Sequence, residues 1–311
     1  MSEQRRHNRS GAAEVDNALV QQTERSLQTL MSKFGEPHQR LLQSLMDQGA
    51  LPTEKACALF RQSLRQSLRE GEREAARLPE YRTSESRKQA IDQIINLVND
   101  RLRVIAFRVI RAVDDFDAQT EYLVLASQRA YSPSLAEFAH LSPDEVGLLS
   151  KWLEVIMGEG RGSIDQIVAL NKVVELPNRL SRDRAQAVID RLARSNWIVV
   201  DNDMGVLRLH QRAIVELGAY LKTQLDADEC PLCKWPVVNA DLHGQCTRCE
   251  CRVHRHCMAT LTRAVNGAQL KCPGKRPDGR DCGADWSNDE NAAPASPMNL
   301  RMEGDTTDES D

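Results

Sequence analysis

Cysteine and histidine gather near the C-terminal end of the chain, at spacings that suit metal binding. Eight of the nine cysteines lie between Cys230 and Cys282. The first ten residues, MSEQRRHNRS, hold no apolar run of the kind that a secretory signal needs. In a chain without such a signal, clustered cysteines favour metal ligation over disulfides. We therefore expect zinc in this region.

Two tetrahedral zinc ions need eight protein ligands, and seven cysteines and one histidine supply them here. In an interleaved arrangement, site one takes Cys230, Cys233, His254 and Cys257, and site two takes Cys246, Cys249, Cys272 and Cys282. The alternative is a sequential arrangement, with the first four ligands on one ion. The short gap between Cys249 and His254 would then place the two ions very close together, so the spacing favours interleaving.

Three further residues near these ligands leave alternatives open. Cys251 could replace Cys249, and His256 could replace His254, each at poorer spacing. His243 lies in the sequence DLHG and is expected to be a solvated loop residue. Both sites have four protein ligands and no open position, which indicates structural zinc rather than catalytic zinc. Each ion would then contribute roughly 10–16 kcal/mol to folding.

The elements that precede the cysteines are expected to form two winged helices. In the first, helices start at Pro37, at Pro52 and near Ser84, and the last of them runs to Asn99. Two strands follow, within Val104–Val113 and Tyr122–Ala126. Cys57 falls among apolar residues in the second helix and is expected to be a buried structural thiol.

The same order of elements repeats further along the chain. Helices are expected after Ser142, over Ser163–Val173 and from Ser181. A hairpin follows, in which Trp197–Val200 and Val206–Leu209 flank a turn that contains Asp-Asn-Asp-Met-Gly. A last helix is expected over Arg212–Leu225. The repeat predicts a second winged helix.

These patterns predict a mainly α (α+β) protein, with tandem winged-helix domains followed by a small two-zinc cross-brace domain. The expected segments are an N-terminal arm that is disordered or loosely docked (1–34), winged-helix domain A (35–130), winged-helix domain B (141–225), the zinc domain (226–287) and an acidic disordered tail (288–311). Only 4% of residues are aromatic, which suits small helical domains. No apolar run approaches the roughly 18 residues needed to span a bilayer, so no membrane partner is expected.

Charge gives little support to direct nucleic-acid binding. The net charge is −4, and the segment 287–311 carries −6 of it, which leaves the remainder at +2. Five arginines gather around the third helix of domain B and could face phosphates: Arg179, Arg182, Arg184, Arg191 and Arg194. Asp183 and Asp190 dilute that charge. A solvated or protein-binding face is therefore the favoured interpretation of this helix.

The sequence resembles the non-SMC element 1 family, RING-like subunits of the five–six type SMC complex. The resemblance rests on the eight ligands, on Trp286 just after the last one, and on three runs of residues: LLQSLMDQGAL, RLARSNWIVV and LHQRAIVELGAYL. It implies a RING-type ubiquitin ligase that acts in DNA repair in the nucleus, associated with chromosomes. It also implies two structural Zn²⁺ ions, a MAGE-domain subunit bound by the winged helices, a kleisin subunit, and contact with DNA mainly through the complex.

A RING ligase has no catalytic side chain of its own; it holds a ubiquitin-conjugating enzyme beside the substrate. Leu232, inside the first cysteine pair, is the candidate contact for that enzyme, with Trp235 or Met258 in support, although all three could simply pack the zinc domain. The rival hypotheses are a non-catalytic zinc scaffold that docks the MAGE and kleisin subunits, and a DNA-binding regulator.

Two features depart from the pattern of the resembled family. Its final cysteine pair is normally separated by two residues, whereas nine residues, PGKRPDGRD, separate Cys272 from Cys282. Many active RING domains also carry a basic residue beside the last ligand, where it bridges to ubiquitin. Gly283 stands there in this chain, so weak activity without a partner is expected.

Overall fold

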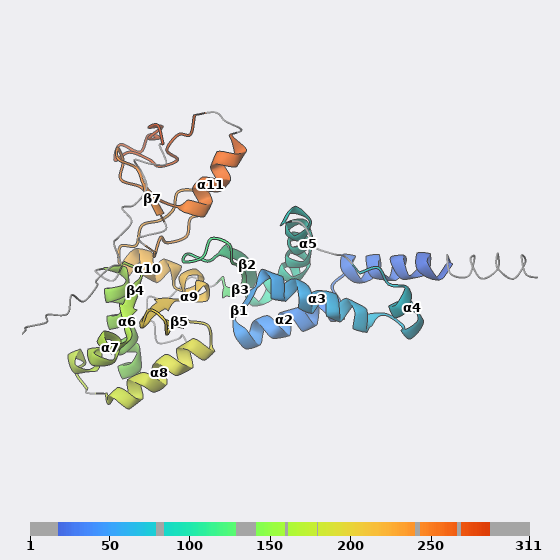
Figure 1. Cartoon of the computed structure of the whole chain (residues 1–311), viewed down its shortest axis with the longest axis horizontal. Coiled ribbons are helices and arrows are strands. Elements are labelled where there is room, and N and C mark those ends of the chain that lie inside the picture. The colour runs from blue at the N-terminus through green and yellow to red at the C-terminus, as the bar shows by residue number, and fades with distance from the viewer. Residues whose placement is uncertain are drawn as a thin grey trace, which may run out of the picture. The chain divides into compact units, whose positions relative to one another are not determined.

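The computed structural model describes residues 18–78, 84–128, 141–158, 161–178, 180–239, 243–265 and 269–286. The chain divides into two compact units, Met1–Ala227 and Asp228–Asp311 (Figure 1). The expected acidic tail, over 288–311, lies outside the described residues, as do residues 1–17 of the expected arm. The first unit is mainly helical with two small sheets, which confirms the predicted fold class.

The first winged helix runs from α2 to β3. Its elements are α2 (Glu36–Gln48), β1 (Ala50–Pro52), α3 (Thr53–Ser67), α4 (Glu70–Ala75), α5 (Ser84–Leu102), a 3₁₀ turn η1 (Arg103–Ile105), β2 (Phe107–Val113) and β3 (Glu121–Ser127). The strands form an antiparallel sheet in the order β1-β3-β2. Apolar side chains at helical spacing, among them Leu45, Phe60 and Leu64, are fully buried between the helices and this sheet.

The second winged helix repeats this arrangement from α6 to β6. Its elements are α6 (Pro143–Met157), β4 (Ser163–Asp165), α7 (Gln166–Asn171), a 3₁₀ turn η3 (Lys172–Glu175), α8 (Arg182–Arg194), β5 (Ile198–Asp201) and β6 (Val206–Leu209), followed by α9 (Gln211–Glu216) and α10 (Gly218–Gln224). The sheet order is β4-β6-β5. Trp152 of α6 is buried, and its indole N–H donates to the Ala169 carbonyl at 2.9 Å.

The N-terminal segment differs from the expected loose arm. Residues 18–32 form a helix, drawn in blue in Figure 1. Leu27 is buried in the core of the first winged helix, with Leu30, Met31 and Phe34 packed against the same core. Leu27, Leu30 and Met31 lie on one face of this helix, and Phe34 follows just after its end, so a short apolar stripe packs the segment onto the domain. Ser26 also donates a hydrogen bond to the buried Glu72 carboxylate at 2.9 Å.

Two elements of the second winged helix differ from the expected ones. The segment expected to be helical from Ser163 opens with β4, because this strand pairs with β6; the Asp165 carboxylate then caps α7 by accepting from the Ile167 and Val168 N–H groups. The expected last helix is divided at Leu217 into α9 and α10. Within the described part of the chain, no helix combines the length and apolar character needed to cross a bilayer.

Polar contacts join the two winged helices within the first unit. The Asn196 side chain donates to the Gln48 carbonyl at 3.0 Å. The Gln211 side chain accepts from the backbone N–H of Asp115 at 3.2 Å. The rings of Tyr122 and His210 meet edge to face, with centroids 4.7 Å apart. The two winged helices therefore pack against each other within this unit.

His210 should make the stability of this unit depend on pH. Burial, with the neighbouring Arg212 and Arg208, lowers its pKa from 6.5 to about 4. As the pH falls, His210 of the unfolded chain therefore binds a proton near pH 6.5, whereas His210 of the folded chain binds it only near pH 4. Stability is full above that window and falls as the pH drops through it, by about 3 kcal/mol in all. Urea unfolding of the full chain at a series of pH values measures this.

The matched control for this prediction is His210→Asn. The imidazole Nδ1 accepts from the Arg212 N–H at 3.0 Å at the start of α9. An asparagine amide oxygen can accept the same bond but does not titrate. The variant should lose the steep part of the pH profile. An unchanged slope between pH 6.5 and 4 would assign that slope to other groups.

Candidate metal centre

Four side chains from two distant segments form the first group of the second unit. Cys230, Cys233, His254 and Cys257 offer ligand atoms that all lie within 4.8 Å of one another. His254 ends β8 (Arg252–His254), and Cys257 lies in the first turn of α11 (Arg255–Ala264). The His254 Nδ1 atom is 3.3 Å from the Cys233 sulfur and 3.9 Å from the Cys257 sulfur.

The other ring nitrogen of His254 has a partner that suits metal binding. Nε2 lies 3.2 Å from the Pro236 carbonyl oxygen, so that a proton on Nε2 leaves the Nδ1 lone pair facing the three sulfurs. A carbonyl that orients the ring in this way is typical of histidines that bind zinc. His254 is also buried, which protects the site from water.

Four cysteines form the second group. Cys246, Cys249, Cys272 and Cys282 again offer sulfurs within 4.8 Å of one another. The Cys246 and Cys282 sulfurs are 3.9 Å apart, and those of Cys249 and Cys272 are 3.6 Å apart. A tetrahedron with Zn–S bonds of about 2.3 Å has edges of about 3.8 Å. The four thiols therefore fit a tetrahedral zinc ion.

The two groups alternate along the sequence, and each begins with the same tight turn. Lys234 follows the first cysteine pair, has a φ of 68°, and donates its backbone N–H to the Cys230 carbonyl at 2.9 Å. Glu250 follows the pair in the second group, has a φ of 58°, and donates to the Cys246 carbonyl at 2.9 Å. The two groups have the members of the interleaved arrangement. Along the chain, the ligands of one group therefore lie between the ligands of the other.

The three residues left over in the sequence lie close to these groups. The Cys251 sulfur is 3.5 Å from that of Cys272, but Cys251 is outside the group of four. The His256 ring stacks on that of His254, with centroids 4.9 Å apart. His243 corrects an expectation: it is buried in β7 (His243–Gln245) rather than solvated, because β7 pairs with β8 and places His243 opposite His254.

The nine residues between Cys272 and Cys282 form an ordered hairpin. Lys275 pairs with Asp281, and the Cys282 N–H donates to the Gly274 carbonyl at 2.8 Å. Gly274 is needed at this point, since a Cβ there would come within 2.4 Å of the Cys251 sulfur. The insertion thus leaves the two cysteines side by side.

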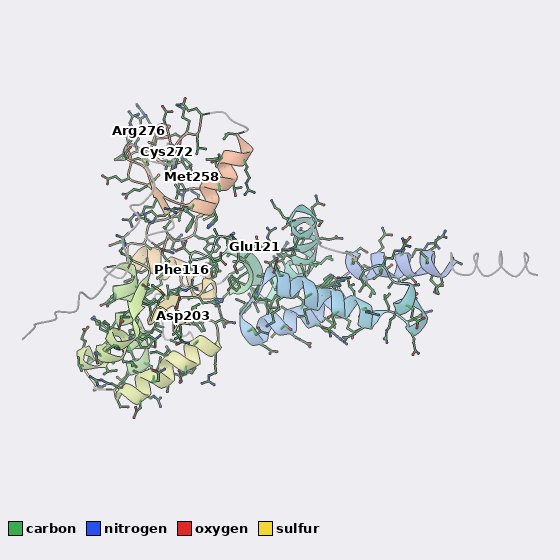
Figure 2. The ribbon with its side chains drawn as sticks, in the orientation of Figure 1. Phe116, Glu121, Asp203, Met258, Cys272 and Arg276 are labelled. Atoms are coloured by element: carbon green, nitrogen blue, oxygen red, sulfur yellow. The ribbon has the colours of Figure 1, made fainter. Side chains whose placement is uncertain are left out.

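The candidate contact for a conjugating enzyme is accessible. Leu232 is 36% exposed, whereas Met258, labelled in Figure 2, is only 5% exposed and belongs to the same buried cluster as the cysteines. Trp235 is partly buried, and Trp286 is buried in the same cluster as Met258. Of the three apolar residues considered for this contact, Leu232 is the one that solvent reaches most, and Met258 is a packing residue.

Two of the arginines around α8 form ion pairs with a buried carboxylate. Arg184 and Arg191 both pair with Glu145, at 2.8 Å each, and the Glu145 side chain is 1% exposed. Arg179 lies outside the described residues. Two of the five arginines thus hold α8 against α6, which leaves less charge for a phosphate backbone and agrees with the favoured interpretation of this helix.

The chain was compared with known proteins. No family model matches it. The "Non-structural maintenance of chromosomes element 1 homolog" of Xenopus tropicalis is 24% identical over 248 residues, which is 78% of this chain and 83% of that protein. The homologue from Xenopus laevis is 22% identical over 232 residues, 73% of this chain and 77% of that protein.

A solved structure described as "Nse1-Nse3-Nse4 complex" contains a similar chain. Its TM-score is 0.58 at 21% identity, and the match covers 82% of this chain and 97% of that one. The fold and the two groups of ligands define a tandem winged-helix protein with a RING-like, two-metal module. Within that class, the chain resembles the non-SMC element 1 proteins, which confirms the resemblance predicted from its sequence.

Proposed function

We propose that this chain is a RING-type ubiquitin ligase subunit of a five–six type SMC complex, which acts in DNA repair in the nucleus. The observation that carries the proposal is Leu232, which is exposed inside the first cysteine pair of a module with two interleaved groups of ligands. An apolar side chain there gives a conjugating enzyme a contact that is fixed rigidly by the adjacent ligands Cys230 and Cys233.

In this proposal, zinc occupies both groups and supplies folding free energy rather than chemistry. Cys230, Cys233, His254 and Cys257 hold one ion, and Cys246, Cys249, Cys272 and Cys282 hold the other. The module itself transfers no group; it orients a ubiquitin-loaded conjugating enzyme towards a substrate lysine. The winged helices bind a MAGE-domain subunit and the kleisin joins them, by analogy with the complex of three proteins named for the similar structure. DNA is reached mainly through the complex.

Leu232→Ala should weaken conjugating-enzyme binding and ubiquitin discharge about tenfold, because a truncated interface anchor typically costs 1–2 kcal/mol. Leu232 is exposed, so zinc content and assembly with the MAGE and kleisin subunits should not change. The rate of discharge from a loaded conjugating enzyme and the affinity for the unloaded one measure this effect.

A matched control is Met204→Ala, which removes an apolar side chain of similar size that is 53% exposed and lies in the β5–β6 turn of the first unit. It should leave discharge unchanged when the chain is assayed without its MAGE-domain partner, so that any contact of this turn with the partner does not enter the comparison. The second candidate function is a non-catalytic zinc scaffold, favoured by Gly283 at the position where many active RING domains carry a basic residue. Equal discharge by wild type and Leu232→Ala would remove the support that Leu232 gives to the ligase.

A further inference from the structure

The inserted hairpin fixes an arginine beside the last cysteine of the module. The Arg276 N–H donates to the Arg280 carbonyl at 2.8 Å, and the Gly279 N–H donates to the Arg276 carbonyl at 2.9 Å. Pro277 and Gly279, the latter with a φ of 81°, complete the turn. Together with the Lys275–Asp281 bridge, these bonds hold the backbone of Arg276 in one place.

The guanidinium of Arg276 turns back over the peptide that follows the last cysteine. Its Nη2 atom lies 3.4 Å from the Cys282 carbonyl oxygen, whose carbon is bonded to the nitrogen of Gly283. Its Nε atom is buried without a hydrogen-bond partner. Among the described residues, no carboxylate forms an ion pair with it. Arg276 and Cys272 are both labelled in Figure 2, in the same module. The guanidinium therefore keeps donors that the chain itself does not use.

Position 283 is open. Gly283 has a φ of 58°, and a Cβ built there would meet nothing within 4 Å. Apart from its own chain neighbours, no atom of the described chain therefore occupies the place that a side chain at position 283 would begin to fill. A cation that bridges a conjugating enzyme to ubiquitin usually projects from this position. In this chain the hairpin places the Arg276 guanidinium on the adjacent Cys282 carbonyl.

We infer that Arg276 is the positioning residue that bridges the conjugating enzyme and its bound ubiquitin, in place of the basic residue missing at position 283. This inference rests on the proposed ligase function. An arginine suits the role because its planar fork can donate to backbone carbonyls of two partners at once. The nine-residue insertion then has a function: its hairpin supplies the positive charge that Gly283, the residue after the last cysteine, lacks.

Arg276 does not take part in the bond changes of the transfer; it holds the ubiquitin in a reactive orientation. In that transfer the amine of the acceptor lysine forms an amide with the C-terminal carbonyl carbon of ubiquitin. The thioester C–S bond of the conjugating enzyme breaks, and the proton given up by the amine ends on the departing cysteine sulfur. Ordering the thioester favours this attack over unproductive conformations.

The test uses the full chain with its zinc and with the MAGE-domain partner. Arg276→Ala should slow ubiquitin discharge about tenfold, the loss expected for one charge-assisted hydrogen bond, and Arg276→Lys should restore part of the rate. The affinity for the unloaded conjugating enzyme should not change, whereas that for a stable conjugate with ubiquitin should fall. Arg280→Ala is the matched control: it removes the same charge from an exposed position of the same hairpin and should leave discharge unchanged.

A variant that places the positive charge at position 283 distinguishes a bridging role of Arg276 from a merely structural one. Gly283→Arg in the Arg276→Ala background should recover discharge, since Lys234 and Glu250 show that this chain tolerates side chains at a similar φ. Normal discharge by Arg276→Ala would overturn the inference alone. So would a loss that comes with lower zinc content and that Gly283→Arg does not rescue, because Arg276 would then only support the Cys282 carbonyl. No discharge by zinc-loaded wild type would overturn the proposed ligase itself, and the inference with it.

Discussion

Cys230→Ser is expected to remove at least one of two zinc ions and to unfold the cysteine-rich unit. Half of the buried members of this unit's cluster are candidate ligands, and the other four are Val237, Val253, Met258 and Trp286. So small an apolar core cannot offset the chain entropy of folding by itself. A structural zinc site contributes on the order of 10 kcal/mol or more, so losing one ligand should affect the whole module.

Elemental analysis of zinc per chain, with hydrogen exchange over residues 228–286, measures this effect. Because the two groups share their connecting segments, exchange should rise throughout the unit and not only near Cys230. Cys251→Ser is the matched control: this thiol is 3.5 Å from the Cys272 sulfur but lies outside the group of four, so two zinc ions should remain. Loss of zinc from Cys251→Ser would show that Cys251 is a ligand and that the second set is wrongly assigned.

Arg212→Ala is expected to destabilise the winged-helix unit by about 3–5 kcal/mol. The Arg212 guanidinium donates to Glu216 and to the Ser195 carbonyl, both at 2.7 Å, and lies over the Trp197 ring at 4.7 Å. The Glu216 side chain is only 14% exposed. Burial already raises the pKa of Glu216, while Arg212 opposes that rise. Removal of the arginine would leave a buried carboxylate without its counter-charge.

Urea unfolding followed by tryptophan fluorescence measures this change. The control variant is Arg212→Ala/Glu216→Leu, which removes the carboxylate together with its partner and should regain much of the lost stability. If the double variant is as unstable as the single one, the contacts to Ser195 and Trp197 carry the effect instead of the buried charge.

The same arginine explains why glycine stands at the end of α2. A Cβ on Gly49 would come within 2.1 Å of the Arg212 guanidinium, and the φ of 72° is itself unfavourable for other residues. Arg212 thus lies where the second winged helix approaches the first. The sequence marks Gly49 as a helix stop but cannot show this second role, because the contact joins residues far apart in the chain.

Local patterns predicted the features that depend on local spacing. The cysteine pairs at two-residue gaps and the helices with apolar stripes are of this kind, and Cys57 lies in the core of the first winged helix as expected, where burial raises its pKa to about 11. Short strands were harder to predict. β1 and β4 have three residues each and exist because Ala50 pairs with Val124 and Ile164 pairs with Leu207, partners that no local window contains.

In the zinc module, too, local sequence patterns do not predict contacts that depend on distant pairing partners. The spacing of the cysteines groups the eight side chains as the structure does. It does not show that His243 is buried opposite His254, nor that the insertion turns Arg276 back to Cys282. Both depend on hairpin pairing within the unit. A glycine at position 283 together with basic residues in the insertion is the signal that could have drawn attention to Arg276.

Ubiquitin discharge from a panel of loaded conjugating enzymes is the most direct test of the proposed ligase. The chain would be assayed alone and with its MAGE-domain partner, after elemental analysis has confirmed two zinc ions per chain. We predict weak discharge by the chain alone and clear stimulation by the partner, with at least one conjugating enzyme. Absence of discharge from every enzyme in the panel, by zinc-loaded protein assembled with its partner, would contradict the ligase and leave a docking module.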